Sequence, residues 1–471
     1  MNKRNGLLRL ASAALAAALC LTACGAPAAS SAPQPTETPA AVGGENVTLG
    51  GRDAQGQNGV VSTGRAEATR IGVDVLKAGG NAVDAAVAIG FALGVCEQQS
   101  SGIGGGGFMM VRFAKTGEIK FLDFRDESAA AASLDMWTVD ENGKVAGDEN
   151  KIGAKAVAVP GEVKGMLYAL DNYGTMSREE VMAPAIQLAE EGFTVSDITS
   201  RDIKDAYGTI IRFPATEKLY LDENGFPYEP GDTIRNPDLA ATLRTIAAEG
   251  ESAFYTGDIA QKIVDAVQAE GGCLTMEDMA NYEIHVGEPV HGTYRGYDVY
   301  SSNLPSSGGS IILEILNILE NFDVGGMDPE SPEYFHLLSE AFKLGFADRT
   351  KYMGDPAYVD VPVSGITNKD YAAQLAASID PEHSQTYEAG DPWPFESEST
   401  THYSIMDAEG NMVAVTKTVD ATFASGLVAE GTGILLNDTL FDFSVDPESP
   451  NVVAGSKRPI SSMSPTLILK D

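Results

Sequence analysis

The strongest constraint on the fold is a helical segment with no polar face, followed closely by a run of glycines. Asn81 is a suitable N-cap, and residues 82–95 are apolar nearly all round. A helix without a polar face has to be covered on every side, so it belongs in a protein core. Length alone would suggest about three domains, but no proline- or serine-rich linker interrupts the chain after residue 50.

The remaining patterns alternate loosely between helix and strand. Helices are expected over residues 66–78, 181–192, 258–270, 310–319 and 331–346. Strands are expected over residues 108–113, 119–123, 154–161, 292–302 and 464–470. This alternation indicates an α/β or α+β class and argues against a helical bundle or a β-sandwich.

The glycine-rich stretch 101–108 matches the dinucleotide fingerprint G-x-G-x-x-G through Gly102, Gly104 and Gly107. That fingerprint requires a strand before the glycines and a helix after them. Here a helix precedes them and a strand follows. We therefore expect the glycines to allow a close approach of two backbone segments instead of binding a nucleotide.

The first 50 residues are expected to be a targeting segment and a tether. Lys3, Arg4 and Arg9 precede a short apolar run, which ends in L-T-A-C at Cys24. This ending resembles a bacterial lipobox, although an ordinary secretory signal could also contain a cysteine. We predict a signal peptide over 1–24, lipidation of Cys24 and a disordered tether over 25–50. The protein would then lie on the extracellular face of the bacterial cell membrane, or in the periplasm if the envelope has an outer membrane.

Composition limits the partners. The formal net charge of −35 argues against nucleic acid and against electrostatic adhesion to anionic lipid, so a lipid anchor would be the only membrane contact. Cys96 and Cys273 lie in apolar surroundings and are expected to be buried free thiols. The five histidines are scattered, so we expect no metal site, and no cofactor is predicted.

Two polar features have more than one interpretation. Thr400, in S-T-T-H-Y, could simply begin a polar strand. If the chain were cut before it, however, its new α-amine would be a base attached to its own hydroxyl nucleophile, with a pKa of about 7.7–8.0. Arg125 follows a predicted strand beside two acids, and could form a surface ion pair or offer a planar fork to a substrate carboxylate.

From about residue 55 onward the chain resembles γ-glutamyltransferases, which belong to the N-terminal-nucleophile hydrolases. Eight segments carry the resemblance, in that family's order: G-G-N-A-V-D-A-A at 79–86, S-G-I-G-G-G-G-F at 101–108, D-F-R at 123–125, A-V-P-G at 158–161, P-S-S-G-G at 305–309, F-A-D-R at 346–349, T-T-H-Y-S at 400–404 and R-P-I-S-S-M-S-P at 458–465. The resemblance implies an α+β fold in four αββα layers, with two antiparallel sheets between helices.

The resemblance also implies self-cleavage between Ser399 and Thr400. Residues 51–399 would be part of the large subunit, and residues 400–471 would begin the small subunit, which remains associated with it. Thr400 would attack the γ-carbonyl of a γ-glutamyl amide such as glutathione and form an acyl-enzyme. Water, an amino acid or a peptide would then accept the glutamyl group. The Thr418 hydroxyl would orient Thr400.

The family's substrate contacts fall on several further residues. Arg125, Ser461 and Ser462 would hold the α-carboxylate of the donor, which favours the ligand interpretation of Arg125, and Asp442 would hold its α-ammonium. Two positions depart from the usual pattern. Asp420 stands where many relatives have asparagine, and we interpret it as a second contact to the α-amine. Thr439 stands where glutamine or glutamate is common, which weakens one contact. His402 is interpreted as structural.

The last departure is at the end of the chain. Residues 464–470 are expected to form a strand with an unpaired apolar edge, and the family's next segment carries the oxyanion-hole glycines. We therefore expect the C-terminal part of the family's fold to be missing and a polypeptide of this length to be nearly inactive. The alternatives are a poly-γ-glutamate transpeptidase or acylase of the same fold, or an unprocessed, inactive surface binding lipoprotein.

Overall fold

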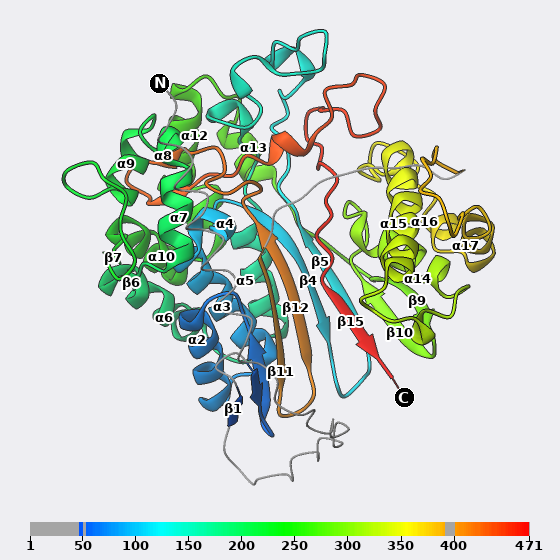
Figure 1. Cartoon of the computed structure of the whole chain (residues 1–471). Coiled ribbons are helices and arrows are strands. Elements are labelled where there is room, and N and C mark those ends of the chain that lie inside the picture. Colours follow the sequence, from blue (N-terminus) through cyan, green and yellow to red (C-terminus); the bar gives the residue numbers. More distant parts are fainter. Residues whose placement is uncertain (1–46, 50–52, 391–400, 471) are drawn as a thin grey trace, which may run out of the picture. The chain divides into compact units, whose positions relative to one another are not determined.

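The computed structural model describes residues 47–49, 53–390 and 401–470 and contains a six-stranded antiparallel sheet at its centre (Figure 1). The strand order is β3 (Gly59–Ser62), β11 (Thr401–Asp407), β12 (Met412–Thr418), β4 (Gly106–Arg112), β5 (Ile119–Phe124) and β8 (His285–Gly287). The hairpin β11–β12 thus lies between strands from the first quarter of the chain. In its register with β4, Thr418 pairs with Gly106 and Met412 pairs with Arg112.

A second sheet faces the first. Its order is β15 (Thr466–Leu469), β10 (Tyr297–Ser301) and β9 (Val290–Tyr294), and all pairs are antiparallel. One buried apolar cluster joins the two sheets, formed by Phe108, Met110, Ile119, Phe121, Ala414, Met463 and Leu467. Because β4, β5 and β12 contribute to this cluster together with β15, one face of each sheet is buried against the other.

Helices cover the other face of the six-stranded sheet (Figure 1). The longer ones are α2 (Ala66–Lys77), α3 (Ala82–Cys96), α5 (Glu162–Tyr173), α6 (Arg178–Glu191), α10 (Pro237–Glu249) and α12 (Asp258–Ala269). The shorter ones are α4 (Gln98–Ser101), α7 (Asp197–Asp205), α8 (Tyr207–Ile210), α9 (Pro214–Tyr220), α11 (Glu251–Tyr255) and α13 (Met276–Asn281). As predicted, Asn81 caps α3 and every residue of that helix is buried.

A second helical layer covers the three-stranded sheet. It consists of α14 (Gly308–Leu319), α15 (Pro332–Tyr352), α16 (Val363–Ile366) and α17 (Lys369–Ala376). Leu313 of α14 packs on Val290 and Val299 of the sheet. The order of layers is therefore helix, sheet, sheet, helix, and the predicted α+β class with αββα layers is confirmed.

Three small two-stranded pairs complete the strands. They are β1 (Val47–Leu49) with β2 (Asp53–Gln55), β6 (Phe193–Thr194) with β7 (Thr233–Ile234), and β13 (Val428–Ala429) with β14 (Ile434–Leu435). Strand β1 lies within the range predicted as a tether. Residues 1–46, which include Cys24, lie outside the described residues, so the signal, the lipidation and the rest of the tether stay predictions.

Two predicted strands are wrong. Residues 154–161 begin as a 3-10 turn, Ala154–Ala156. The backbone N–H and C=O of Ala158 then bind the Asn437 side chain, at 2.9 and 3.0 Å. Val159 forms a single antiparallel bridge with Glu127, so the pairing does not extend into a strand. Residues 292–302 are not one strand, because Arg295 and Gly296 adopt positive φ angles of 50° and 84° and form the turn of the β9–β10 hairpin.

The predicted strand near residue 470 is present as β15. It pairs with β10 on one side and forms one edge of its sheet among the described residues. Its Ile468 side chain is 58% exposed. Cys96 is buried and Cys273 is half-buried, and both are free thiols as predicted. Within the described part of the chain, no helix is both long enough and apolar enough to cross a bilayer.

The glycine-rich stretch does bring two backbones together, as predicted. A Cβ on Gly105 would lie 1.9 Å from the Thr418 carbonyl oxygen, and one on Gly104 would lie 2.1 Å from the Leu435 carbonyl oxygen. Both distances are far below van der Waals contact. These glycines therefore allow the end of β12 and the strand β14 to pack directly on the loop before β4.

Gly105→Ala is expected to destabilise the protein, since the new methyl group can be placed only by moving β12 or the glycine loop. The expected loss in the free energy of unfolding is about 1–3 kcal/mol or more, measured by urea denaturation. Gly208→Ala on α8 is the control, because a Cβ there meets no atom within 4 Å. Equal stability of the two variants would contradict the close approach.

Candidate active site

Five of the predicted site residues that the structure describes lie at one end of the six-stranded sheet: Arg125, Thr418, Asp420, Thr439 and Asp442. Strand β12 ends at Thr418, opposite the start of β4, and β5 ends beside the same residues of β4. Arg125 and Asp126 follow β5, and Asp420 follows β12. A 3-10 turn, Thr439–Asp442, supplies the remaining acid. Three chain segments from distant parts of the sequence therefore deliver charged side chains to one place.

Arg125 and Asp442 form a buried ion pair at this end of the sheet. Arg125 Nη2 donates to Asp442 Oδ2, and the two side chains are 1% and 5% exposed. Arg125 Nη1 lies 3.9 Å from Asp126 Oδ2. The surface ion pair considered for Arg125 is therefore wrong. Its Nε and Nη1 make no hydrogen bond with any described residue, and neither does Asp442 Oδ1.

Four aspartates share this buried environment: Asp126, Asp420, Asp438 and Asp442. Burial raises the pKa of Asp126 to about 7 and the pKa of Asp438 to about 8. Burial, reinforced by the Asp442 and Asp438 carboxyls, raises the pKa of Asp420 well above its usual range. The pKa of Asp442 is also raised by burial, although Arg125 opposes that shift. The group therefore holds protons at pH values where isolated aspartates would be ionised.

Hydrogen bonds fix the shape of this group. Thr439 Oγ1 donates to Asp126 Oδ2 at 2.9 Å, so the Thr439 hydroxyl, predicted to touch the substrate weakly, supports an acid instead. The backbone N–H of Ala421 donates to Asp438 Oδ1 at 2.9 Å. The other oxygen of each aspartate, Asp126 Oδ1 and Asp438 Oδ2, has no partner among the described residues.

The turn after β12 is tight. The Asp420 backbone N–H donates to Thr418 Oγ1 at 2.9 Å, and Asp420 has a φ of 83°. Aspartate tolerates this left-handed conformation better than most residues, but it still costs free energy. The conformation holds the buried Asp420 carboxyl within electrostatic range of Arg125 and Asp442.

Ser461 and Ser462 lie beside α14 and α15. Ser461 Oγ accepts a hydrogen bond from the Met463 backbone N–H at 3.1 Å. Ser462 Oγ accepts one from Arg349 Nη2 of α15 at 2.7 Å. The Arg349 guanidinium also lowers the pKa of Asp442, which is otherwise raised by burial. Arg349 therefore contacts Ser462 and acts electrostatically on Asp442.

The predicted cleavage site, Ser399 and Thr400, lies outside the described residues. The next residue, Thr401, begins β11 and pairs with Lys417, the neighbour of Thr418. His402 hydrogen-bonds through Nδ1 to the Thr416 hydroxyl and through Nε2 to the Ser404 hydroxyl, both at 2.9 Å. Both ring nitrogens are thus used within the sheet, which fits the structural interpretation of His402.

Lys417 and Glu162 form a second buried ion pair on the opposite face of β12 from Thr418. Lys417 Nζ also donates to the Gly90 carbonyl of α3 at 2.9 Å. At the start of α5, the backbone N–H groups of Gly161 and Glu162 both donate to the Gly105 carbonyl, at 3.0 and 2.9 Å. The pair therefore anchors α5 and the glycine loop against the strand that ends at Thr418.

Sequence reasoning missed five residues of this region: Asp126, Glu162, Arg349, Lys417 and Asp438. A partial signal existed for two of them. Asp126 adjoins the D-F-R segment, and Arg349 ends F-A-D-R. In the sequence, Lys417 looks like an ordinary polar residue of a strand, and Glu162 looks like an ordinary acid at the start of a helix. Their burial becomes evident only in the folded structure.

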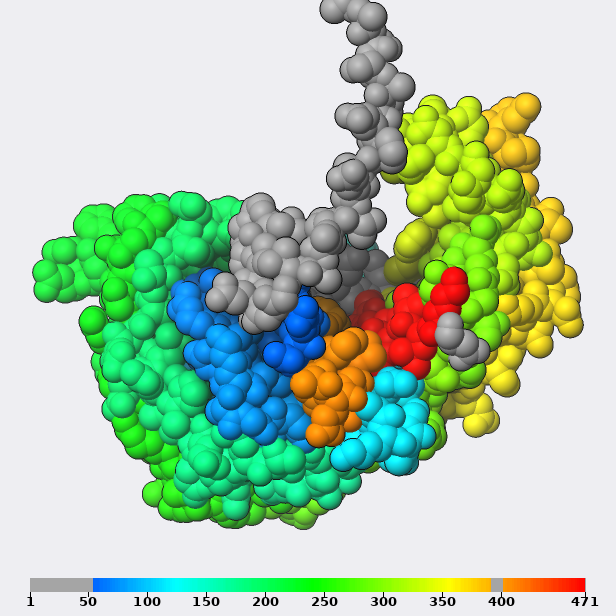
Figure 2. Space-filling model, turned by 90° about the horizontal axis from the view of Figure 1, so that it is seen from below, coloured from blue at the N-terminus to red at the C-terminus, as the bar shows by residue number. Residues whose placement is uncertain are grey.

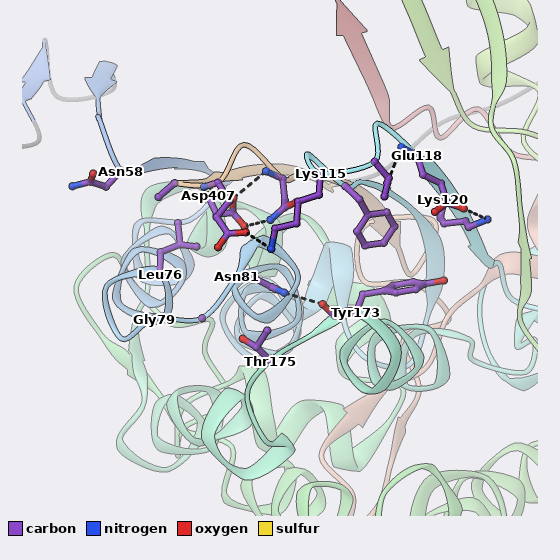
Figure 3. Close-up of a pocket in the computed structure, with 16 residues that line it drawn as sticks. Asn58, Leu76, Gly79, Asn81, Lys115, Glu118, Lys120, Tyr173, Thr175 and Asp407 are labelled. Atoms are coloured by element: carbon purple, nitrogen blue, oxygen red, sulfur yellow. Dashed lines mark hydrogen bonds and ion pairs between the residues drawn. The ribbon is translucent and has the colours of Figure 1, made fainter.

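A cavity of about 690 Å³ lies elsewhere, at the opposite end of the sheet (Figure 3). The β4–β5 and β11–β12 turns line it, and Figure 2 shows these turns side by side in cyan and orange. Asp407, in its wall, already accepts hydrogen bonds from the backbone N–H of Ala82 and the Asn411 side chain. The lining of this cavity includes none of the predicted site residues that the structure describes, so we place the site at the Arg125 end.

No three histidine, cysteine, aspartate or glutamate side chains of the described ranges are grouped so that they could hold a metal ion. The described side chains at the Arg125 end are a guanidinium, hydroxyls and carboxyls. Together they offer charges of both signs in a buried setting.

Comparison with known proteins identifies the family. The gamma-glutamyltranspeptidase family model matches residues 68–471. The chain is 42% identical to the glutathione hydrolase proenzyme of Escherichia coli strain K12, over all of this chain and 81% of that protein. It is 41% identical to the glutathione hydrolase proenzyme of Bacillus subtilis strain 168, over 88% of this chain and 73% of that protein.

A solved structure agrees. The cephalosporin acylase from Bacillus halodurans superposes with a TM-score of 0.79 at 30% identity, covering 93% of this chain and 78% of that one. The chain belongs to the gamma-glutamyltranspeptidase family, and it is an enzyme of that family. The resemblance stated from the sequence is thereby confirmed.

Proposed function

We propose that the protein is a γ-glutamyl hydrolase or transpeptidase that uses Thr400 as its nucleophile. The observation that carries the proposal is the buried Arg125–Asp442 pair at the end of β5, in a chain similar to glutathione hydrolase proenzymes. A γ-glutamyl donor ends in an amino-acid head group with both charges. Arg125 and Asp442 offer the two opposite charges that such a head group requires.

The proposed contacts follow from the unused polar atoms. Arg125 Nε and Nη1 and Asp442 Oδ1 are buried and make no hydrogen bond within the described ranges. The donor α-carboxylate would approach Arg125, supported by Ser461 and Ser462, and the α-ammonium would approach Asp442 and Asp420. Binding would thereby satisfy atoms that are otherwise costly to leave unpaired.

The proposed chemistry begins with cleavage between Ser399 and Thr400, in line with the word proenzyme in the relatives' names. The freed α-amine of Thr400 would take the proton of its hydroxyl as Oγ attacks the γ-carbonyl carbon. The amide C–N bond would then break, and the amine would leave with that proton. Thr418, whose neighbour Lys417 pairs with Thr401, would orient the nucleophile.

The test is a panel of donors. We expect the purified protein to release amine from glutathione and from γ-glutamyl anilides, and to transfer the glutamyl group to added amino acids or peptides. α-Glutamyl anilide, which carries the same charges in another arrangement, is the control and should not react. No release from any γ-glutamyl donor would overturn the proposal.

A second candidate, an acylase, is favoured by the similarity to the Bacillus halodurans cephalosporin acylase. An acylase would accept substrates whose acyl group lacks the α-ammonium group. The same assay separates the two candidates: glutaryl anilide lacks only that group, and faster release from it than from γ-glutamyl anilide would favour the acylase.

We also propose that the enzyme is held outside the cell membrane by lipid on Cys24. The support is the sequence L-T-A-C after a basic and apolar start. Cys24→Ser is therefore expected to move the protein from the membrane fraction to the soluble fraction, because acyl chains would be its anchor. Fractionation of cells that express each form measures this. Cys273→Ser is the control, and membrane retention of Cys24→Ser would contradict the anchor.

A further inference from the structure

The pocket around Arg125 contains more acidic than basic groups. Asp126 and Asp442 both lie within ion-pair distance of the guanidinium. Asp420 interacts electrostatically with Arg125, and Asp438 with Asp420 and Asp442. If all four acids were ionised, one contacting cation would face four buried negative charges. Such an excess is costly in a low-dielectric interior, so the empty pocket has to retain protons.

Two other cations act on the group from neighbouring elements. Arg349 of α15 acts on Asp442, and Lys151 acts on Asp438. Arg349 donates hydrogen bonds to Ser462 and to Ser307. The Lys151 Nζ lies over the Phe441 ring, 4.7 Å from its centroid. Both cations act on the aspartates electrostatically, and Arg125 is the cation whose ion pairs with Asp126 and Asp442 define the group.

A second observation points to a cationic ligand. No N–H or hydroxyl donor of the described ranges reaches Asp420 Oδ2, Asp438 Oδ2 or Asp442 Oδ1. Asp438 and Asp420 are 0% and 5% exposed, and the Asp442 side chain is 5% exposed. The Asp420 and Asp442 carboxyls hydrogen-bond to each other, which requires a proton between them. An ammonium group could donate to the same oxygens in place of that proton.

We propose that Asp438 links donor binding to proton release: in the empty pocket Asp420, Asp438 and Asp442 share a proton, and the α-ammonium of the γ-glutamyl donor takes its place. The inference rests on the proposed function and adds a specificity residue to that site. The proton passes to solvent, and no covalent bond forms or breaks. At the three carboxyls the ammonium group replaces the proton, so the positive charge beside them is kept. The α-carboxylate of the donor would pair with Arg125.

The direction of the pH effect follows from this exchange. Below the shared pKa, which burial raises into the region of about 8 for Asp438, the pocket is protonated and binding must expel the proton. Affinity for an ammonium ligand should then rise by about tenfold per pH unit and level off above that pKa. The ligand stays mostly cationic below about pH 7.5.

The experiment is isothermal titration calorimetry of the wild-type protein with L-glutamate between pH 5.5 and 7.5. Titrations in two buffers of different ionisation heat give the number of protons released per ligand. We expect about one proton for the wild type at pH 6.5. Asp438→Asn keeps the acceptor for the Ala421 N–H but removes one acid, and should release fewer than half as many.

The affinity of Asp438→Asn for L-glutamate, plotted against pH, should also cross that of the wild type. Without the Asp438 charge the remaining acids lose their proton more easily, so Asp438→Asn should bind L-glutamate more tightly than the wild type at pH 5.5. At pH 7.5 it should bind more weakly, because one attractive charge is gone. A merely structural role would weaken binding at every pH. Asp265→Asn, on the exposed side of α12, is the matched control and should keep the wild-type proton count.

Glutarate, which lacks the ammonium group, should release no proton. The inference is overturned by zero proton release in the wild type, by equal release in Asp438→Asn, by uniform weakening at all pH values, or by release with glutarate. The number of protons that the wild type releases tests the inference without any variant, so misfolding of Asp438→Asn would leave that test intact. Failure of the proposed function would show separately, as no amine release from γ-glutamyl anilide by the wild type.

Discussion

Replacing Thr400 with alanine is expected to abolish both self-cleavage and γ-glutamyl turnover. The substitution removes the hydroxyl that would attack the scissile peptide bond during maturation and the γ-carbonyl during catalysis. Loss of a nucleophile typically lowers kcat by about 10⁴- to 10⁶-fold. A denaturing gel should show one uncleaved chain, and an amine-release assay should show no activity above background.

Thr400→Ser is the matched control, because it keeps the hydroxyl and, after cleavage, the α-amine. It should be cleaved and should retain a measurable part of the turnover. A melting curve for each variant establishes that it is folded. Normal self-cleavage of Thr400→Ala would contradict the assignment of the nucleophile.

The second large effect is expected at Arg125. Arg125→Lys should raise the KM for γ-glutamyl anilide by at least about tenfold, because lysine offers a point charge where arginine offers a planar fork. The guanidinium is buried against Asp442, so water cannot take over its contacts. Steady-state kinetics at saturating and limiting donor concentrations would separate this loss of binding from a change in kcat.

Stability gives Arg125 a second readout. Arg125→Lys leaves a cation beside Asp442. Arg125→Ala removes the cation that contacts Asp442, and it should lower the free energy of unfolding by about 3–5 kcal/mol. Arg244→Lys, at a half-exposed pair with Glu190, is the control and should change neither quantity. An unchanged KM for Arg125→Lys would show that this side chain serves the fold alone.

The fold was largely predictable because its main signals are local. Residues 82–95 are apolar nearly all round, and glycines follow them. These two features predict α3 and β4 without knowledge of the rest of the chain. The failures are also local in origin. Arg295 gives no glycine-like signal at the first turn position, so the β9–β10 hairpin reads as one strand. Residues 154–161 look like a strand because the Asn437 side chain, which binds the Ala158 backbone, lies 279 residues away in the sequence.

The site was predictable only as a set of residue types. The family resemblance indicated Arg125 and Asp442 separately, as ligands for opposite ends of a substrate. Their direct contact joins residues 317 positions apart and depends on how the turn Thr439–Asp442 packs on the end of β5. The surplus of acid depends likewise on burial of Asp126 and Asp438. Their local sequence does not distinguish them from surface aspartates.

The most direct test of the account is mass spectrometry of the enzyme quenched with acid during turnover of γ-glutamyl anilide. The account predicts two polypeptides, one of which begins at Thr400 and carries the added mass of one glutamyl group on that residue. Adding an acceptor peptide should reduce the modified fraction. Turnover by an uncleaved chain, or a glutamyl group on any residue other than Thr400, would contradict it.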